Sequence, residues 1–371
     1  MVSKLFRGIF NTAVIGIMSL LVSSAFTMTA FAASPGDVGT WADTTPIPQS
    51  LSETSSVTYN GHAFVIGGNN GISDVDTVYS APLNPNGTVG TWVTTTPLPQ
   101  NLSNSTSVVY NGYVYVIGGY LDTVYSAPLN LDGTIGAWTT SVTTLPKTIG
   151  QATSITYNGY IYVMGGYDIN TGTTQDTVYS ASISDGVVDT WAASPNSLPQ
   201  ELRFASAITY NDYAYVIGGE SNSGNSDIVY SALLGSNGTV GAWTASDHTL
   251  PKELSDHNAV SYNGYVYVMG GVGNSGGSNA VYSAPLGASG DIGTWVTSSN
   301  TLPQAMRYAS AITYNGYVYN IGGNGSTGNI NNVYYAQLTG YLPPSTLTRT
   351  VTVVSMPEPT ITTLPQTGAD L

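Results

Sequence analysis

The residues of this chain that could do chemistry are few. Only 8% of its 371 residues are charged, three are histidines, and there is no cysteine. Thiol catalysis and thiolate metal ligands are therefore excluded. The histidines stand at non-equivalent positions, and no Ser-His-Asp pattern or glycine-rich phosphate loop is readable. The sequence therefore indicates no metal site and no cofactor, and it singles out no catalytic residue.

Polar and aromatic residues recur at one equivalent point ahead of a repeated strand pattern. In chain order these positions hold Glu53, Asn104, Gln151, Phe204, Asp256 and Tyr308. Polar groups beside aromatic rings at a concave site can hold a sugar or a peptide. The predicted ligand-binding residues are Arg203, Arg307, Glu53, Phe204, Asp256, His257 and Tyr308. The alternative is that the two arginines make buried hydrogen bonds between sheets and that the other side chains are simply solvated.

The repeat that must position these residues is clearest in Tyr110–Gly119. It occurs six times, and each copy ends in a pair of glycines. Asn-Gly between β-branched and aromatic residues is a strong hairpin signal, because a type I′ turn needs positive φ at both central residues. Six tryptophans recur at about the same period of roughly 50 residues, which is typical of propeller blades.

Within one unit we predict four strands. They cover residues 107–110, 113–117, 123–129 and 134–139, and the last one contains Trp138. The sixth copy lacks its tryptophan, while Trp41 precedes the first copy. We therefore expect residues 39–43 to supply the outer strand of the last unit, so that pairing of the two chain ends closes the ring and removes exposed strand edges.

The alternating strand directions assign the loops to two faces. The tight Asn-Gly turns lie on one face and are expected to be structural. The opposite face carries the variable loops, of which the second unit has only Tyr120–Asp122, and it carries the candidate ligand-binding residues around a central mouth. The tyrosines along the strands are expected to pack between sheets rather than to stack on a sugar.

These residues resemble the kelch repeat. The resemblance covers residues 38–340 and rests on the Asn-Gly turn, the glycine pair, the Val-Tyr strand, the tryptophan and a following Leu-Pro. It implies an all-β fold, a six-bladed kelch-type β-propeller over residues 36–340. Many kelch units have an arginine shortly before the first strand, and here only Arg203 and Arg307 keep it.

The two ends of the chain carry targeting patterns. Residues 1–33 have a basic start, an apolar stretch and an Ala-x-Ala site, which predicts a secretion signal; an uncleaved anchor is the alternative. A Pro/Thr-rich linker is expected over residues 341–363. Residues 364–371 then contain Leu364, Pro365, Thr367 and Gly368, which resemble the signal read by sortases, although no apolar span follows. The alternative is a decayed repeat fragment.

The net charge of −14 argues against nucleic acid or an anionic membrane surface as a partner. Together these features predict a secreted protein, linked to a bacterial cell wall if the sortase signal is genuine, that binds a glycan or a protein. The alternative is an enzyme resembling the sialic acid mutarotases. Its acid or base would come from Glu53, Glu201, Glu253, Asp256 or His257. A structural spacer is a third reading.

Overall fold

The computed structural model describes residues 36–339. Every regular element in this range is a β-strand, and no helix there is long and apolar enough to cross a membrane. The all-β class expected from the turns and alternating strands is therefore confirmed for this range.

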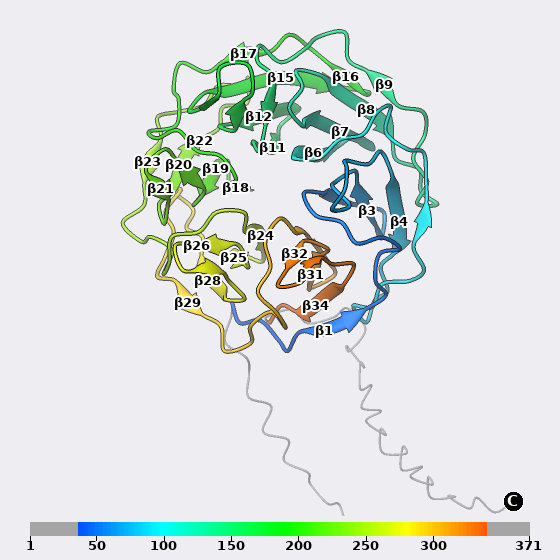
Figure 1. Ribbon diagram of the computed structural model, residues 1–371. Helices are drawn as coiled ribbons and strands as arrows, with labels where there is room; N and C mark the ends of the chain where they lie inside the picture. Colours follow the sequence, from blue (N-terminus) through cyan, green and yellow to red (C-terminus); the bar gives the residue numbers. More distant parts are fainter. Residues whose placement is uncertain (1–35, 340–371) are drawn as a thin grey trace, which may run out of the picture. The chain divides into compact units, whose positions relative to one another are not determined.

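Six antiparallel sheets of four or five strands make up most of the described chain (Figure 1). The first three are β2 (Ser55–Tyr59), β3 (His62–Ile66), β4 (Val78–Pro82) and β5 (Val93–Thr94); β6 (Ser105–Tyr110), β7 (Tyr113–Gly118), β8 (Val124–Pro128) and β9 (Thr139–Thr140); and β11 (Thr153–Tyr157), β12 (Tyr160–Met164), β15 (Val178–Ser184), β16 (Val187–Val188) and β17 (Ala192–Ala193). The other three are β18 (Ser206–Tyr210), β19 (Tyr213–Ile217), β22 (Val229–Leu233) and β23 (Thr244–Ala245); β24 (Asn258–Tyr262), β25 (Tyr265–Met269), β28 (Val281–Pro285) and β29 (Val296–Thr297); and β30 (Ser310–Tyr314), β31 (Tyr317–Ile321), β34 (Val333–Gln337) and β1 (Ala42–Thr44).

The first strand of each sheet lies innermost. Contacts run from β2 to β6, β11, β18, β24 and β30, and β30 contacts β2 again. The sheets are therefore arranged around a central space, as Figure 1 shows. This arrangement of small antiparallel sheets is β-propeller-like.

The N-terminal strand β1 lies in the same sheet as β34, near the other end of the described chain. Ala42 pairs with Tyr335 and Thr44 with Val333, and the Gly39 N–H donates to the Gln337 carbonyl at 2.7 Å. The expected segment, residues 39–43, thus lies beside β34 as predicted, although the strand itself covers Ala42–Thr44. β1 covers the edge that β34 would otherwise expose.

The outer strands are shorter than the sequence predicted. β9 covers only Thr139–Thr140, although we expected a strand over residues 134–139. Ahead of β9 the chain leaves the regular ladder: the Gly136 N–H donates to the Pro128 carbonyl at 2.9 Å, and Ile135 and Leu129 form an isolated bridge. The same arrangement occurs where leucine stands in place of proline, since the Gly241 N–H donates to the Leu233 carbonyl and β23 also covers two residues, so it belongs to the repeat. The chain re-enters the sheet only after Trp138.

The core lies between neighbouring sheets. Tyr115, Tyr162, Tyr215, Tyr267 and Tyr319 occupy equivalent positions in their sheets and are fully buried. A second tyrosine of the same strand, such as Tyr160, packs against a turn glycine of the next sheet, such as Gly238. Gly238 has φ +83°, and a Cβ there would lie 2.4 Å from the Tyr160 ring, so only glycine fits. Tyrosines along these strands therefore serve packing between sheets.

The two faces of the ring differ in how their loops are used. On the face with Asn-Gly turns, turn side chains reach the next sheet: Asn60 donates to the Leu131 carbonyl at 2.8 Å, and Asn158 to that of Ser236 at 2.9 Å. These turns are structural.

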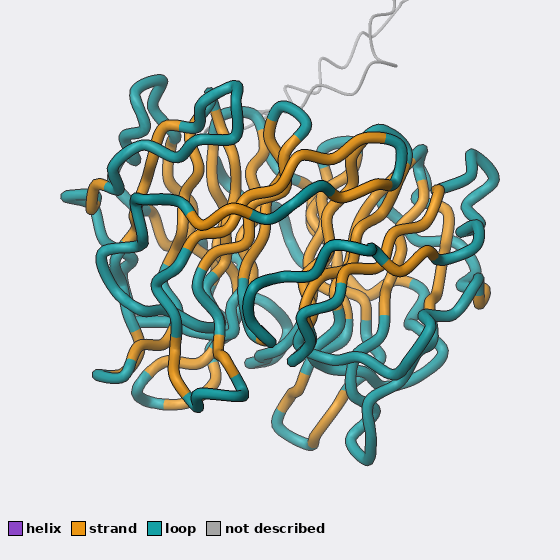
Figure 2. Tube along the Cα trace, turned by 90° about the horizontal axis from the view of Figure 1, so that it is seen from above, coloured by secondary structure: helices purple, strands orange, loops and turns teal. Residues whose placement is uncertain are grey.

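Short hairpins project from the opposite face, seen at the lower side of Figure 2. They consist of β13 (Tyr167–Asp168) with β14 (Thr173–Thr174), β20 (Glu220–Ser221) with β21 (Gly224–Asn225), β26 (Val272–Gly273) with β27 (Gly276–Gly277), and β32 (Asn324–Gly325) with β33 (Gly328–Asn329). β10 (Ile149–Gly150) pairs with β13 and extends that sheet to three strands.

Candidate functional site

Six residues encircle the central space on the hairpin face, and we call them the hub ring. They are Glu53, Asn104, Gln151, Phe204, Asp256 and Tyr308. Each N–H donates to the carbonyl of the counterpart in the preceding sheet, over 2.8–3.3 Å, and Glu53 completes the circle by donating to Tyr308. The six φ angles lie between 53° and 61°. Such left-handed backbone is uncommon for non-glycine residues and gathers at functional sites.

The hub ring opens into a cavity of about 230 Å³, which we call the mouth cavity. Its wall is made of serine, threonine and alanine side chains from the first residues of the innermost strands. Several of the wall hydroxyls are buried and find no hydrogen-bond partner among the described residues: Ser55, Ser56, Ser105 and Ser107. A ligand with hydroxyl groups would find both donors and acceptors there.

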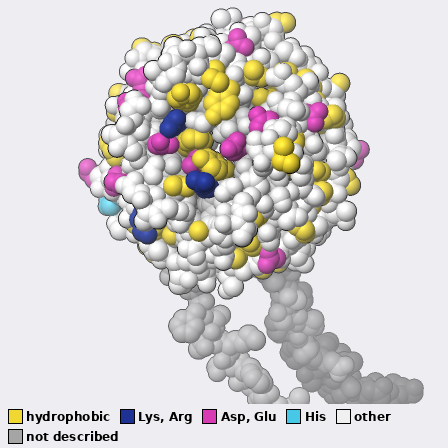
Figure 3. Space-filling view, in the orientation of Figure 1, with side chains coloured by type: hydrophobic (Ala, Val, Ile, Leu, Met, Phe, Trp, Pro, Cys, Tyr) yellow, Lys and Arg dark blue, Asp and Glu magenta, His cyan; other side chains and the backbone are white. Residues whose placement is uncertain are grey.

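One side of the mouth is aromatic and cationic. The rings of Phe204 and Tyr308 lie 5.6 Å apart, tilted by 59°. The Arg203 guanidinium lies 5.8 Å from the Phe204 ring and 5.4 Å from Tyr167, and the Arg307 guanidinium lies 5.2 Å from the Tyr308 ring. In Figure 3 two dark blue cationic groups lie beside yellow and magenta side chains around the hollowed centre of this face. Aromatic faces and cations at one opening suit a ligand that has both apolar ring surfaces and polar groups.

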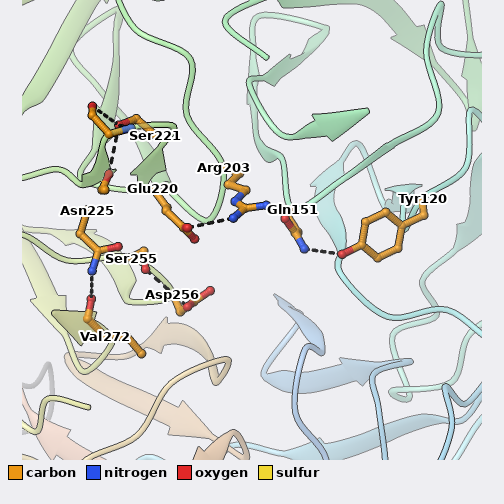
Figure 4. A network of polar contacts seen from close by, with 11 residues as sticks. Tyr120, Gln151, Arg203, Glu220, Ser221, Asn225, Ser255, Asp256 and Val272 are labelled. Carbon is orange, nitrogen blue, oxygen red and sulfur yellow. Dashed lines mark hydrogen bonds and ion pairs between the residues drawn. The ribbon is translucent and has the colours of Figure 1, made fainter. Parts of the chain in front are cut away.

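The opposite side of the mouth is a polar network. Asn104 Nδ2 donates to Glu53 Oε2 at 2.7 Å. Gln151 Nε2 donates to the Tyr120 hydroxyl, as Figure 4 shows. Burial raises the pKa of Glu53, and hydrogen bonds from Ser103 and Asn104 oppose this shift. Gln151 keeps its buried Oε1 without a partner among the described residues.

Asp256 is the most perturbed carboxyl at the mouth. Burial, followed by the negative charge of Glu220, raises its pKa to about 7, while Arg307 and a hydrogen bond from Ser255 act in the other direction. Its Oδ1 is buried without a partner in the described structure. A carboxyl that titrates near neutral pH can give up or accept a proton there.

His257 is adjacent to Asp256, but its ring is not presented to the opening. It is 5% exposed, and a Cβ on Gly218 of the neighbouring sheet would lie 2.8 Å from its Cε1. Burial lowers its pKa to about 4. The equivalent residues of the other five sheets are small, for example Ala205 and Ala309. The backbone position was correctly placed beside the mouth, while burial of the ring cannot be read from sequence.

The two arginines have different surroundings. Arg203 forms an ion pair with Glu220, with Nη2 and Oε1 2.8 Å apart, whereas Arg307 is exposed and forms no ion pair with a described residue. Thus a structural role suits Arg203 better than Arg307. Sequence reasoning missed Glu220, Tyr120 and Tyr167. All three directly follow a glycine pair, and that shared position was the available signal.

Other sequence predictions fall outside this site. Leu364, Pro365, Thr367 and Gly368 and the leader over residues 1–33 lie outside the described residues. Glu201 and Glu253 do not line the mouth cavity. Within residues 36–339 no three His, Asp or Glu side chains are grouped so that they could hold a metal ion.

Comparisons with known proteins address the fold alone. No model of a known protein family matches the chain, and no curated protein matches it. Among solved structures, one described as the structure of YjhT superposes with a TM-score of 0.64 at 16% identity. The match covers 79% of this chain and 95% of that one. The likeness therefore shows that the two chains share a fold.

Proposed function

We propose that this protein is a six-bladed kelch-type β-propeller, with β1 completing the last blade, that binds a glycan in its mouth cavity. The domain limits proposed from the sequence are a leader over residues 1–33, the propeller over 36–340, a linker over 341–363 and a sorting signal over 364–371. On this proposal the protein is secreted and is attached to a bacterial cell wall by sortase. The targeting part rests on sequence patterns at the two ends of the chain.

The observation that carries the binding proposal is the hub ring itself. Six backbones held at positive φ direct six different side chains toward one opening, although the rest of each repeat is nearly uniform. A strained backbone that recurs at six equivalent positions, while the side chains at those positions differ, fits a role in ligand recognition better than a role in packing. The hydroxyl wall and the Phe204–Tyr308 pair favour a sugar over a peptide.

Binding to a glycan array tests the proposal. Phe204→Asn and Tyr308→Asn remove each ring but keep a residue that tolerates left-handed backbone. We expect each change to weaken binding at least about tenfold, since an aromatic pair and its buried area are worth more than about 1.4 kcal/mol. Val93→Ala on the outer strand β5 is the control and should bind like the wild type. Unchanged binding by both mouth variants would remove this site, and retention of a protein rather than a glycan would point to a protein partner.

A second candidate is an enzyme similar to the sialic acid mutarotases. It is favoured by Asp256, whose pKa of about 7 suits general acid–base chemistry at the mouth. NMR measurement of anomer exchange in sialic acid with wild type and Asp256→Asn separates the two functions. Faster exchange that depends on Asp256 supports the enzyme, and exchange at the rate without protein supports the binding module.

A further inference from the structure

We propose that Arg307 is the anion-recognition residue of the mouth and that it binds the carboxylate of a sugar acid, whereas the equivalent Arg203 is occupied by the protein itself. This inference rests on the proposed function, because it assumes that the mouth binds a glycan. It adds the chemical class of that glycan and the residue that selects it.

The two arginines hold the same place in their sheets. Arg203 exchanges both backbone hydrogen bonds with Glu220, at 2.9 and 2.7 Å, and Arg307 exchanges both with Asn324, at 3.1 and 2.7 Å. The partner is in each case the residue that directly follows a glycine pair. The backbones are therefore matched, and any difference in role must come from the two partner side chains.

Those partner side chains differ in charge. Glu220 neutralises Arg203 at 2.8 Å (Figure 4), and this hydrogen bond raises the pKa of the arginine further. Asn324 is neutral, and its Nδ2 donates to Asn329 Oδ1 at 2.9 Å within its own hairpin. No described residue forms an ion pair with Arg307, so its guanidinium keeps its donors for another acceptor. Among the described residues its ring contact is with Tyr308. Arginine donors in this geometry match a carboxylate in a bidentate manner.

Arg307 stands between two hollows of the surface. On one side Tyr308 lines the mouth cavity. On the other, Arg307 borders a groove of about 360 Å³ between the hairpins β26–β27 and β32–β33, whose lining includes Gly276, Gly277 and Gly325. Small residues leave room for a further unit of the ligand. A sugar ring over Tyr308 would therefore place its carboxylate near Arg307 and let the chain continue along the groove.

The acidic side chains at the mouth affect whether an anionic ligand can bind there. Asp256, Glu220 and Glu53 all act on the charge balance here, and each would repel an anionic ligand when ionised. Glu220 is neutralised by Arg203, and burial shifts both Asp256 and Glu53 toward their neutral forms. An anion is therefore tolerated at the mouth despite the acidic composition of the chain.

The test follows the arginine side chains directly. The chain contains four arginines, Arg7, Arg203, Arg307 and Arg349. With ¹⁵N-labelled arginine, each Nε–Hε group gives one NMR signal, and Arg307→Gln and Arg203→Gln assign two of them. D-glucuronate is the probe and neutral D-glucose its control. We expect the Arg307 signal to move with glucuronate at a Kd of about 1–10 mM, as one charge-assisted contact supports, while the Arg203 signal stays in place.

Exchange of the partner residues provides the matched variants. Asn324→Glu should neutralise Arg307 and weaken the glucuronate response about tenfold or more, with Asn324→Gln as the neutral control. Glu220→Gln should free Arg203 and make its signal respond.

The outcomes separate this inference from the proposed function. An Arg307 signal unmoved by glucuronate, or equal responses of Asn324→Glu and Asn324→Gln, overturns the inference. If neutral glycans then still bind and Phe204→Asn still abolishes that binding, the proposed function survives. Movement with an acidic peptide but not with glucuronate would overturn the sugar acid as the ligand.

Discussion

Replacement of Asp256 by asparagine should stabilise the protein at alkaline pH and leave it almost unchanged at pH 4. The folded pKa of Asp256 is about 7, against an ordinary value of 3.8. Between these values the folded state holds a proton that the unfolded state has lost, so stability is present below pH 3.8 and is lost as pH rises through 7. Asparagine stays neutral throughout and tolerates the φ of 54°.

The magnitude follows from the size of the shift. A difference of about three pKa units corresponds to roughly 4 kcal/mol of unfolding free energy. Because Asp256 borders the mouth cavity, solvent screening lowers this figure, and we expect Asp256→Asn to gain about 2–4 kcal/mol at pH 8. Even the lower value is a large part of the stability of an ordinary domain.

The variant must be compared with the wild type at each pH, because His257 opposes Asp256. Its folded pKa is about 4 against 6.5, so the unfolded state binds the extra proton and stability is lost as pH falls through 6.5 toward 4. In the wild type the two slopes cancel between about pH 4 and 6.5, and in Asp256→Asn only the slope of His257 remains.

Urea unfolding followed by tryptophan fluorescence, from pH 4 to pH 8, measures this difference. His257→Ala is the complementary variant, whose stability should fall as pH rises through this range. A gap between Asp256→Asn and wild type that stays constant within about 0.5 kcal/mol from pH 4 to pH 8 would refute the reasoning, because the shift predicts a change several times larger.

Three further outcomes are expected. Gly238→Ala, at φ +83°, places a Cβ 2.4 Å from the Tyr160 ring and should destabilise by about 2–3 kcal/mol. Gly71→Ala, at a similar φ of +87° with only the Asn329 side chain at 3.7 Å, should show backbone strain of about 1 kcal/mol, and equal losses in urea unfolding would contradict the packing argument. Removal of residues 36–44 exposes the edge of β34, so it should promote aggregation and lower the Tm by about 10 °C. An unchanged Tm in calorimetry would mean that β1 contributes little to stability. The affinity of Arg307 for glucuronate should rise about threefold or more as pH falls from 8 to 6, because Asp256 becomes neutral. In Asp256→Asn the affinity should no longer depend on pH in this range. A variant whose affinity is as pH-dependent as that of the wild type would exclude Asp256 as the cause.

Much of the fold could be predicted from the sequence because the same pattern of turns and strands occurs six times. The Asn-Gly turns, the glycine pairs and the partner of β1 followed from spacing alone, and so did the positions of the hub ring. The outer strands were overestimated because residues 134–138 leave the regular ladder, so that only Thr139–Thr140 pair as a strand. The strand-like composition of a segment does not show where its pairing with the next strand begins.

The site was readable as a set of positions but not as a set of interactions. Arg203 and Arg307 look alike in sequence, and their difference lies in residues 220 and 324, which become meaningful only when the fold pairs them across a bridge. Burial of the His257 ring likewise depends on Gly218 of another sheet. Such contacts join residues far apart in the chain, and a single sequence does not show which distant residues are paired.

The closed circle of hydrogen bonds in the hub ring is made by peptide groups, so it does not depend on which side chains project from it. Substitutions at these six positions can therefore change the ligand surface while that backbone circle is kept. The limit is the left-handed backbone, which disfavours valine, isoleucine and threonine at those six places. One scaffold could in this way give rise to a set of receptors that differ in what they hold and agree in how they are held together.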